Sequence, residues 1–160
     1  MLLLARVEPS YQTDLRQTGI YNCSNAPVLL VHRNPTSLLI LKAMLVHRPW
    51  GTYETLLDDD NYKVKRIIIL PQQQISLQYH NDREEHWTIV SGTGTVRVGD
   101  DTFKASLGSR FFINKKQIHR ATADKDSHLV FVEVQLGDCN ENDIVRLEDQ
   151  YGREGFKYED

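Results

Sequence analysis

The sequence predicts an all-β fold, a small antiparallel jelly roll built from two sheets. Short runs rich in β-branched and aromatic residues follow one another from residue 62 to residue 135. Gly, Asn and Asp separate these runs at the regular spacing typical of a sandwich or barrel. The length of 160 residues is enough for one substantial core and favours a single domain. A mixed α+β domain is the less favoured alternative.

The strands can be assigned in order along the chain. Residues 62–70 (YKVKRIIIL) are β-branched and end before Pro71, and residues 74–80 alternate between two faces. The sequence Gly99-Asp100-Asp101 is a hairpin signal. A weak helical pattern predicts a short C-terminal helix over residues 142–150. The other expected strands are residues 85–91, 95–98, 102–105, 110–113, 118–123 and 128–135.

Composition excludes several classes of function. A net charge of −3 and a pI near 6.1 leave no basic surface typical of a nucleic-acid-binding protein. No apolar run approaches the length of a membrane span. Cys23 and Cys139 match no zinc or redox spacing, which favours a reducing compartment, and we expect a cytoplasmic location.

A boundary is expected near residues 47–51, where Pro49 and Gly51 punctuate the sequence. We interpret residues 1–46 as an N-terminal extension or a divergent linker. Residues 47–160 then form the domain.

The stretch 76–87 (SLQYHNDREEHW) concentrates side chains that can bind a metal ion. Gln78 and His80 point to the same face of their expected strand, and Glu85 can project beside them from the next strand. His119 stands at the start of a later strand. Imidazole and carboxylate are normal zinc ligands, and mixed nitrogen and oxygen sets also suit iron, manganese or cobalt. On spacing alone, an exposed polar hairpin with an isolated histidine is an equally open interpretation.

The sequence resembles known families at these residues. The pattern Gln78-x-His80-x4-Glu85-x6-Gly92, followed by Gly108-x10-His119, resembles the two motifs of the cupins. Further segments within residues 47–154 are similar to the type II mannose-6-phosphate isomerases. They are residues 48–53 (RPWGTY), 62–66 (YKVKR), 76–80 (SLQYH), 85–87 (EHW), 91–93 (SGT), 143–146 (DIVR) and 148–153 (EDQYGR).

The resemblance implies a cupin-type double-stranded jelly-roll barrel that interconverts mannose 6-phosphate and fructose 6-phosphate. This reaction would supply GDP-mannose for polysaccharide biosynthesis. It also implies a divalent metal, expected to be zinc, with cobalt, manganese or magnesium as alternatives. Its ligands would be Gln78, His80, Glu85 and His119. In that family the domain stands alone or follows a mannose-1-phosphate guanylyltransferase, whose catalytic motifs are not matched by residues 1–46. Guanylyltransferase activity is therefore not expected.

One turn departs from the family pattern. The second cupin motif usually carries Pro and Gly before its histidine, and here these positions are Asn114 and Lys116. Asn tolerates the left-handed backbone conformation, but Lys adopts it only at a cost. The turn that directs His119 is therefore a point at which the site could differ.

Aldose–ketose isomerisation needs a polarised carbonyl, an acid–base group and contacts to the phosphate. Lys65, His86 and Glu133 are the candidates for proton transfer, and the sequence does not choose among them. Lys63 and Lys65 share one face of their strand, where they could bind phosphate or a sugar oxygen, or lie on an exposed edge. Arg146 is favoured over Arg153 for binding phosphate or stabilising an enediolate. A solvated helix with surface ion pairs is the alternative for residues 141–153.

These considerations give a set of expected roles. The catalytic residues are Arg146 and Lys65, and the substrate-binding residues are Lys63, His86, Glu133 and Arg153. The expected partner is a small sugar phosphate, and analogy with cupins suggests a homodimer formed through edge strands. A non-catalytic sugar-binding or regulatory cupin is the main alternative function. A metal-independent cupin epimerase is disfavoured by the four expected metal ligands.

Overall fold

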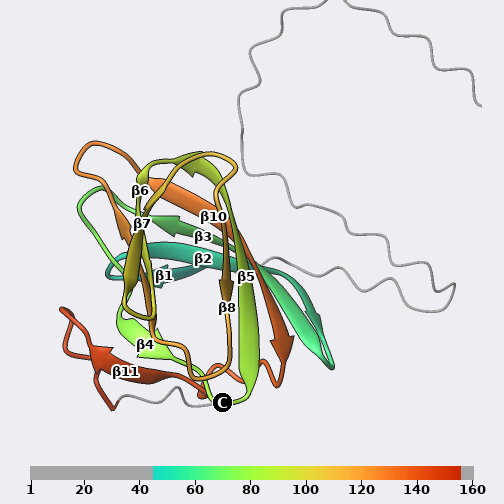
Figure 1. Ribbon diagram of the computed structural model, residues 1–160. Helices are drawn as coiled ribbons and strands as arrows, with labels where there is room; N and C mark the ends of the chain where they lie inside the picture. Colours follow the sequence, from blue (N-terminus) through green and yellow to red (C-terminus); the bar gives the residue numbers. More distant parts are fainter. Residues whose placement is uncertain (1–44, 156–160) are drawn as a thin grey trace, which may run out of the picture.

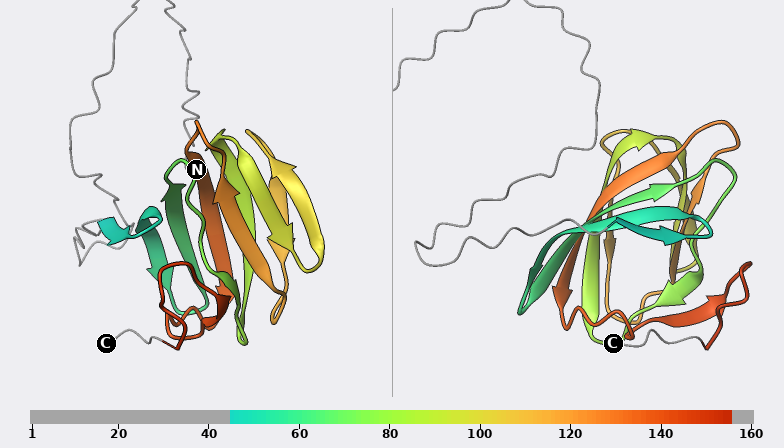
Figure 2. Two further views of the ribbon diagram at one scale, coloured as in Figure 1. Left: turned by 90° about the vertical axis from the view of Figure 1, so that its left-hand side faces the viewer. Right: turned by 180° about the vertical axis from the view of Figure 1, so that it is seen from behind.

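The computed structural model describes residues 45–155, which form two antiparallel sheets facing each other as the walls of a barrel (Figures 1 and 2). Every regular element within these residues is a strand. With no helix among residues 45–155, none is available to cross a membrane. The architecture confirms the predicted double-stranded jelly roll.

The first sheet has six strands and the second has five. In spatial order, the first contains β1 (Leu45–Arg48), β2 (Gly51–Asp59), β3 (Tyr62–Ile69), β10 (Leu129–Gly137), β5 (Arg83–Gly92) and β8 (Arg110–Ile113). The second contains β11 (Val145–Glu148), β4 (Leu77–Tyr79), β9 (His119–Ala123), β6 (Gly94–Val98) and β7 (Asp101–Ala105). The expected strands between residues 62 and 135 are all present, with ends shifted by a few residues.

The expected C-terminal helix over residues 142–150 is wrong. Strand β11 occupies this segment and pairs with β4, so that Val145 lies opposite Tyr79 and Arg146 opposite Gln78. The helical pattern was weak, and pairing with the exposed edge of β4 gives the backbone a hydrogen-bonding partner that local propensity does not foresee. The pairing also buries Arg146, which has 9% of its surface exposed.

The start of the domain also differs in detail from expectation. Pro49 and Trp50 form the turn of a hairpin between β1 and β2, neither of which was assigned from the sequence. Strand β1 begins at Leu45 and therefore spans the expected boundary between residues 46 and 47. Residues 1–44 of the expected N-terminal extension lie outside the described residues.

The interior of the barrel is apolar at one end and polar at the other. Side chains of β3, β10 and β5 face inward in rows that follow the strand register. Moving toward the polar end, the rows are Ile67, Phe131 and Ile89, then Lys65, Glu133 and Trp87, then Lys63, Gln135 and Glu85. Each fully buried apolar side chain contributes about 1.5–3 kcal/mol to stability, so the apolar end holds the sheets together. The polar end can then carry groups that a core would exclude.

The turn before His119 adopts the strained geometry that its sequence raised as a question. Lys116 has a φ of 63°, in the left-handed region. Its backbone N–H donates a hydrogen bond of 2.6 Å to the carbonyl of His80, and the N–H of Gln117 donates to the carbonyl of Asn114 at 3.0 Å. A non-glycine residue in this conformation costs about 1–2 kcal/mol. The turn therefore links the segments that carry His80 and His119, at the expense of strain in Lys116.

We predict that Lys116→Gly stabilises the protein by about 1 kcal/mol, because glycine adopts a positive φ without the Cβ clash. Urea denaturation measures the change. Lys115→Gly is the matched control, since Lys115 is an exposed neighbour in the same turn without a positive φ. It should be neutral or slightly destabilising. A loss of stability in Lys116→Gly equal to that in Lys115→Gly would contradict the prediction.

Candidate metal centre

Three side chains at the polar end of the barrel form a compact cluster. His80 lies one residue after β4, Glu85 belongs to β5, and His119 is the first residue of β9. One possible ligand atom from each lies within 4.8 Å of the others. All three residues are buried, with at most 2% of their surface exposed. The sequence prediction that these residues converge from separate strands is confirmed.

Backbone carbonyls fix the orientation of both histidine rings. The Nδ1 atom of His80 faces the carbonyl oxygen of Asp143, and that of His119 lies 2.9 Å from the carbonyl oxygen of Gln117. A carbonyl can only accept, so each Nδ1 carries the proton and each Nε2 keeps its lone pair. The Nε2 atoms lie 3.1 and 3.5 Å from the two carboxylate oxygens of Glu85. This is the arrangement typical of histidines that bind a metal through Nε2.

Gln78 lies beside this cluster with the nitrogen of its amide, and not the oxygen, directed toward His119. Its Nε2 atom is 3.4 Å from Nε2 of His119, and its Oε1 accepts a hydrogen bond of 2.6 Å from the hydroxyl of Ser76. A half-turn of the amide would exchange the two atoms and direct the oxygen toward the cluster. The structure therefore brings together all four residues that the sequence predicted as ligands.

Asp143 holds the turn between His80 and Glu85. Its carboxylate accepts hydrogen bonds from the backbone N–H groups of Asn81 at 3.0 Å and Asp82 at 2.8 Å, and its carbonyl faces the His80 ring. Burial tends to raise the pKa of Asp143, but these hydrogen bonds lower it below its usual value. Asp143 thus sets the position of His80 through both its backbone and its side chain.

The electrostatics of the cluster suit a divalent cation. Burial tends to raise the pKa of Glu85, but His80, His119 and Arg83 hold it well below its usual range. Burial lowers the pKa of His119 to about 4. At neutral pH the site therefore offers an ionised carboxylate and a neutral imidazole. This donor set fits zinc and also suits manganese, cobalt or iron.

Sequence reasoning missed Arg83, which packs directly against the cluster. Its Nε donates to Glu85 Oε1 at 3.1 Å, one terminal nitrogen lies 3.3 Å from His80 Nε2, and the other donates to the carbonyl of Asn140 at 2.7 Å. Arg83 lies two residues before Glu85 and therefore on the same face of β5. Counting strand positions could have found it.

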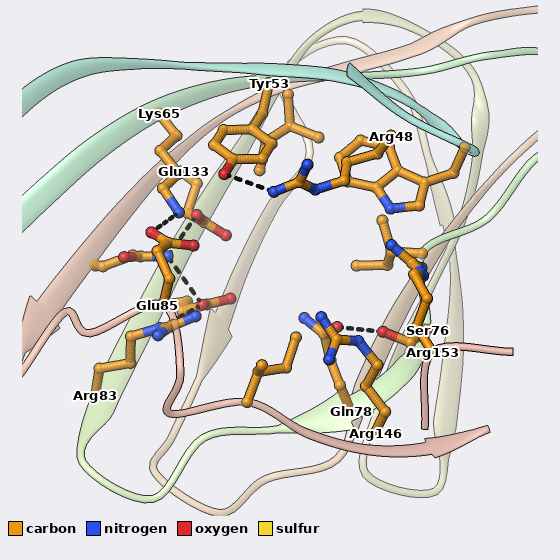
Figure 3. A pocket seen from close by; sticks show the side chains of 16 residues that line it. Arg48, Tyr53, Lys65, Ser76, Gln78, Arg83, Glu85, Glu133, Arg146 and Arg153 are labelled. Carbon is orange, nitrogen blue, oxygen red and sulfur yellow. Dashed lines mark hydrogen bonds and ion pairs between the residues drawn. The ribbon is translucent and has the colours of Figure 1, made fainter. Parts of the chain in front are cut away.

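A pocket opens beside the cluster and contains several predicted substrate residues. Lys65, Glu133, Arg146 and Arg153 line it (Figure 3). Lys63 is buried just outside this lining, where its ammonium group lies 3.2 Å from Asp58 and 3.4 Å from Glu141. The pocket therefore brings together four of the six predicted catalytic and substrate-binding side chains. Arg48, Tyr53, Ser76 and Gln135 also line it and had been assigned no role from the sequence.

His86 is not brought to the pocket. It is exposed on the outer surface of β5, and its ring packs edge-on against Phe112 with centroids 4.6 Å apart. Adjacent residues of a strand face opposite ways, so the inward position of Glu85 directs His86 outward. The expectation that His86 contacts substrate conflicts with this position.

Glu133 is the buried carboxyl group in the pocket with the strongest signature of acid–base chemistry. Its oxygens accept hydrogen bonds from the indole N–H of Trp87 at 3.0 Å and the amide of Gln135 at 2.8 Å. Burial, together with repulsion from Glu85, raises the pKa of Glu133 to about 8. A carboxyl group with such a pKa exchanges its proton near neutral pH.

The connection between β10 and β11, residues 138–144, crosses the polar end of the barrel (Figure 1, lower end). We refer to it as the strap. Glu141 of the strap forms ion pairs with Lys65 and Lys63. Together with the contacts of Asn140 and Asp143, these pairs close one side of the site.

The domain is similar in sequence to a known family and to several known proteins. The family model described as "Mannose-6-phosphate isomerase C-terminal" matches residues 39–149. The alginate biosynthesis protein AlgA of Pseudomonas aeruginosa and the xanthan biosynthesis protein XanB of Xanthomonas campestris are each 40% identical over 109 residues. A mannose-1-phosphate guanylyltransferase of Salmonella muenchen is 37% identical over 112 residues. The alignments cover 68–69% of this chain but only 23–24% of these relatives, so the chain spans about a quarter of their length.

Solved structures support the fold. The capsular polysaccharide assembling protein CapF of Staphylococcus aureus matches with a TM-score of 0.59 and 20% identity, over 67% of this chain and 34% of that one. The cupin-2 domain Rru_A2000 of Rhodospirillum rubrum matches with a TM-score of 0.59 and 16% identity, over 79% of this chain and 84% of that one. The cupin barrel, the cluster of His80, Glu85 and His119 and the extent of the family match lead to one conclusion: the chain belongs to the family of mannose-6-phosphate isomerase C-terminal domains.

Proposed function

We propose that this domain is a metal-dependent aldose–ketose isomerase that interconverts mannose 6-phosphate and fructose 6-phosphate. The observation that carries the proposal is the orientation of the two imidazoles. Each has its Nδ1 against a backbone carbonyl and its Nε2 directed at Glu85, beside a pocket that contains cationic groups and a second carboxyl group. Membership of the isomerase family supports the choice of substrate.

His80, Glu85 and His119, with Gln78 after a half-turn of its amide, would hold the divalent metal, and zinc is the proposed ion. When bound, the ion would polarise the sugar carbonyl and stabilise negative charge that develops on its oxygen. Arg146 lines the same pocket and can stabilise the enediolate by hydrogen bonding.

Glu133 is the favoured group for moving the proton between C1 and C2 of the sugar. It lines the pocket, and its pKa of about 8 lets it accept and return a proton near neutral pH. Lys65 is less available because its ammonium group pairs with Glu141 of the strap. The outward position of His86 removes it from this comparison.

The relatives give a cellular setting to propose. Two carry names in alginate and xanthan biosynthesis, and a third is named as a mannose-1-phosphate guanylyltransferase. We propose that this domain contributes mannose 6-phosphate toward GDP-mannose for polysaccharide biosynthesis. Residues 1–46 match no nucleotidyltransferase motif, so transfer of the guanylyl group is not part of the proposal.

We predict that protein stripped of metal with a chelator does not form fructose 6-phosphate from mannose 6-phosphate. Zinc, cobalt, manganese or magnesium, added back separately, should restore turnover in a coupled assay for at least one ion. His80→Ala should bind that ion at least about 100-fold more weakly, because a ligand is lost outright, whereas loss of a group that only orients a ligand costs 10–100-fold. Metal-binding calorimetry measures this loss independently of activity.

His128→Ala is the matched control, since His128 is exposed and lies next to the apolar end of the barrel. It should retain metal and turnover. Folded protein that binds metal but gives no turnover with any of the four ions would remove the isomerase proposal and leave a sugar-binding role.

A second prediction concerns pH and the stability of the metal-free protein. The raised pKa of Glu133 means that the folded state keeps a proton that the unfolded chain loses between about pH 4.5 and pH 8. Glu133 therefore contributes stability below this window and loses it as pH rises through about 8. We expect the difference in unfolding free energy, Glu133→Gln minus wild type, to increase steadily from pH 5 to pH 8. Urea denaturation with chelator present measures it, and a difference independent of pH would refute the assignment.

A further inference from the structure

The charged side chains of the pocket are divided between two sides. Arg83, Glu85 and Glu133 lie on one side together with Lys65, and Arg48, Arg146 and Arg153 lie on the other (Figure 3). Arg48 reaches toward the first side as far as Tyr53, whose ring Lys65 also contacts, 4.8 Å from its centroid. We call these the acidic side and the arginine side. The acidic side includes two of the acid groups that line the pocket, and the third, Glu141, pairs with Lys65. Because of this division, a ligand with a negative charge at one end would bind in one orientation, with that end at the arginine side.

The cations of the acidic side are already matched by carboxylates, and Arg153 of the arginine side is matched by Asp149 in the same way. Glu141 pairs with both Lys65 and Lys63, and Lys63 also lies 3.2 Å from Asp58. Although burial tends to raise it, the pKa of Glu141 is lowered, mainly by Lys65. A phosphate placed here would have to displace Glu141 from the lysines and would face further carboxyl groups nearby. Like charges at such close range are strongly unfavourable.

The arginine side is built to hold guanidinium groups in fixed positions. Arg48 donates to the hydroxyl of Tyr53 at 3.3 Å and lies over its ring, 5.3 Å from the centroid. Arg153 is held by Asp149 through two hydrogen bonds of 2.7 and 2.9 Å and lies over the ring of Tyr151. Aromatic and forked contacts of this kind fix the plane of a guanidinium group. A planar guanidinium matches phosphate oxygens in pairs, which an ammonium group does not.

Arg48 is the last residue of β1, and the turn that follows it anchors it at the pocket. Trp50 in the turn is buried, and its carbonyl accepts a hydrogen bond of 3.0 Å from the backbone N–H of Leu70. Gly51 follows with a φ of 149°, and a Cβ there would lie 2.0 Å from the carbonyl oxygen of Ile68. The close approach of this backbone to β3 therefore depends on glycine and fixes Arg48 at the pocket.

We propose that Arg48, together with Arg146 and Arg153, forms the subsite for the phosphate group, and that the sugar carbonyl end is thereby directed toward Glu85 and Glu133. This orientation rests on the proposed function for the sugar, but the anion subsite itself does not. It keeps the expected role of Arg146 in binding phosphate, and it favours the arginines over Lys63 and Lys65, for which phosphate, a sugar oxygen and an exposed edge had been alternatives. It also assigns a role to Arg48.

Calorimetry with the full chain tests the subsite, using inorganic phosphate and mannose 6-phosphate as probes. The protein is treated with chelator beforehand, so that phosphate cannot bind through a metal ion. Arg48→Met should weaken both probes at least about 10-fold, the loss of a charge-assisted hydrogen bond. Arg48→Lys, which keeps the charge but not the fork, should lose a smaller factor. Arg110→Met is the matched control because Arg110 is exposed on β8, away from the pocket, and it should change neither affinity.

Lys65→Met is the competing variant, and it should weaken phosphate binding less than Arg48→Met does. An equal or larger loss in Lys65→Met overturns the subsite, as does absence of binding of either probe to wild type. Thermal denaturation confirms that each variant is folded. If Arg48→Met disturbs the fold, protection of Arg48 by phosphate against phenylglyoxal, followed by mass spectrometry of wild-type protein, decides the question in its place.

Turnover separates this inference from the proposed function. If the wild-type protein binds phosphate through Arg48 but does not isomerise mannose 6-phosphate, the isomerase proposal fails and the subsite stands. If the wild-type protein isomerises the sugar and Arg48→Met leaves the KM unchanged, the subsite fails and the isomerase proposal stands.

Discussion

The buried carboxylate of Glu85 is the group on which the rest of the site depends. One oxygen lies 3.1 Å from both Arg83 and His80, and the other lies 3.2 Å from the indole nitrogen of Trp87 and 3.5 Å from His119. A buried carboxylate without such partners would cost several kcal/mol, so its neighbours must be held in place around it. Arg83 and the indole N–H of Trp87 donate hydrogen bonds to Glu85 and keep its charge in the barrel, whereas the two imidazole lone pairs that face the same carboxylate donate nothing to it. A cation held between these lone pairs and Glu85 would complete the satisfaction of the buried charge.

The strap supplies acceptors for the cationic side chains on the inner face of the first sheet. Strands place Lys63, Lys65 and Arg83 inward, but a sheet offers few free acceptors to side chains of its own inner face. The strap crosses the polar end and provides Glu141 to the lysines and the carbonyl of Asn140 to Arg83. It continues into β11, which carries Arg146 to the pocket. The apolar end of the barrel supplies most of the hydrophobic stabilisation, and this division lets charged groups occupy the other end.

The sequence predicted those parts of the molecule that follow local rules. Alternation over residues 62–66, 74–80 and 85–91 grouped side chains by face, and it predicted correctly that Gln78, His80 and Glu85 come together. The same alternation, applied one residue further, would have put His86 outside. The contacts between Lys65 and Glu141, 76 residues apart, leave no periodic signal in either segment. The pairing of β11 with β4 and the place of Arg48 in the pocket also arise only when distant segments meet. The left-handed turn at Lys116 could be raised as a question because the cupin motif usually carries Gly at this position, and Lys adopts a positive φ only at a cost.

Among residues 45–155, strand β1 lies at the edge of its sheet and pairs only with β2, through four residue pairs. Edge strands with few neighbours belong to the segments that open at the lowest free energy and exchange their amide hydrogens first. Local opening of β1 would carry Arg48 away from the pocket while His80, Glu85 and His119 stay within the closed barrel. Occupancy of the pocket and fraying of this edge are therefore thermodynamically linked, and a ligand that contacts Arg48 should slow hydrogen exchange in β1 selectively.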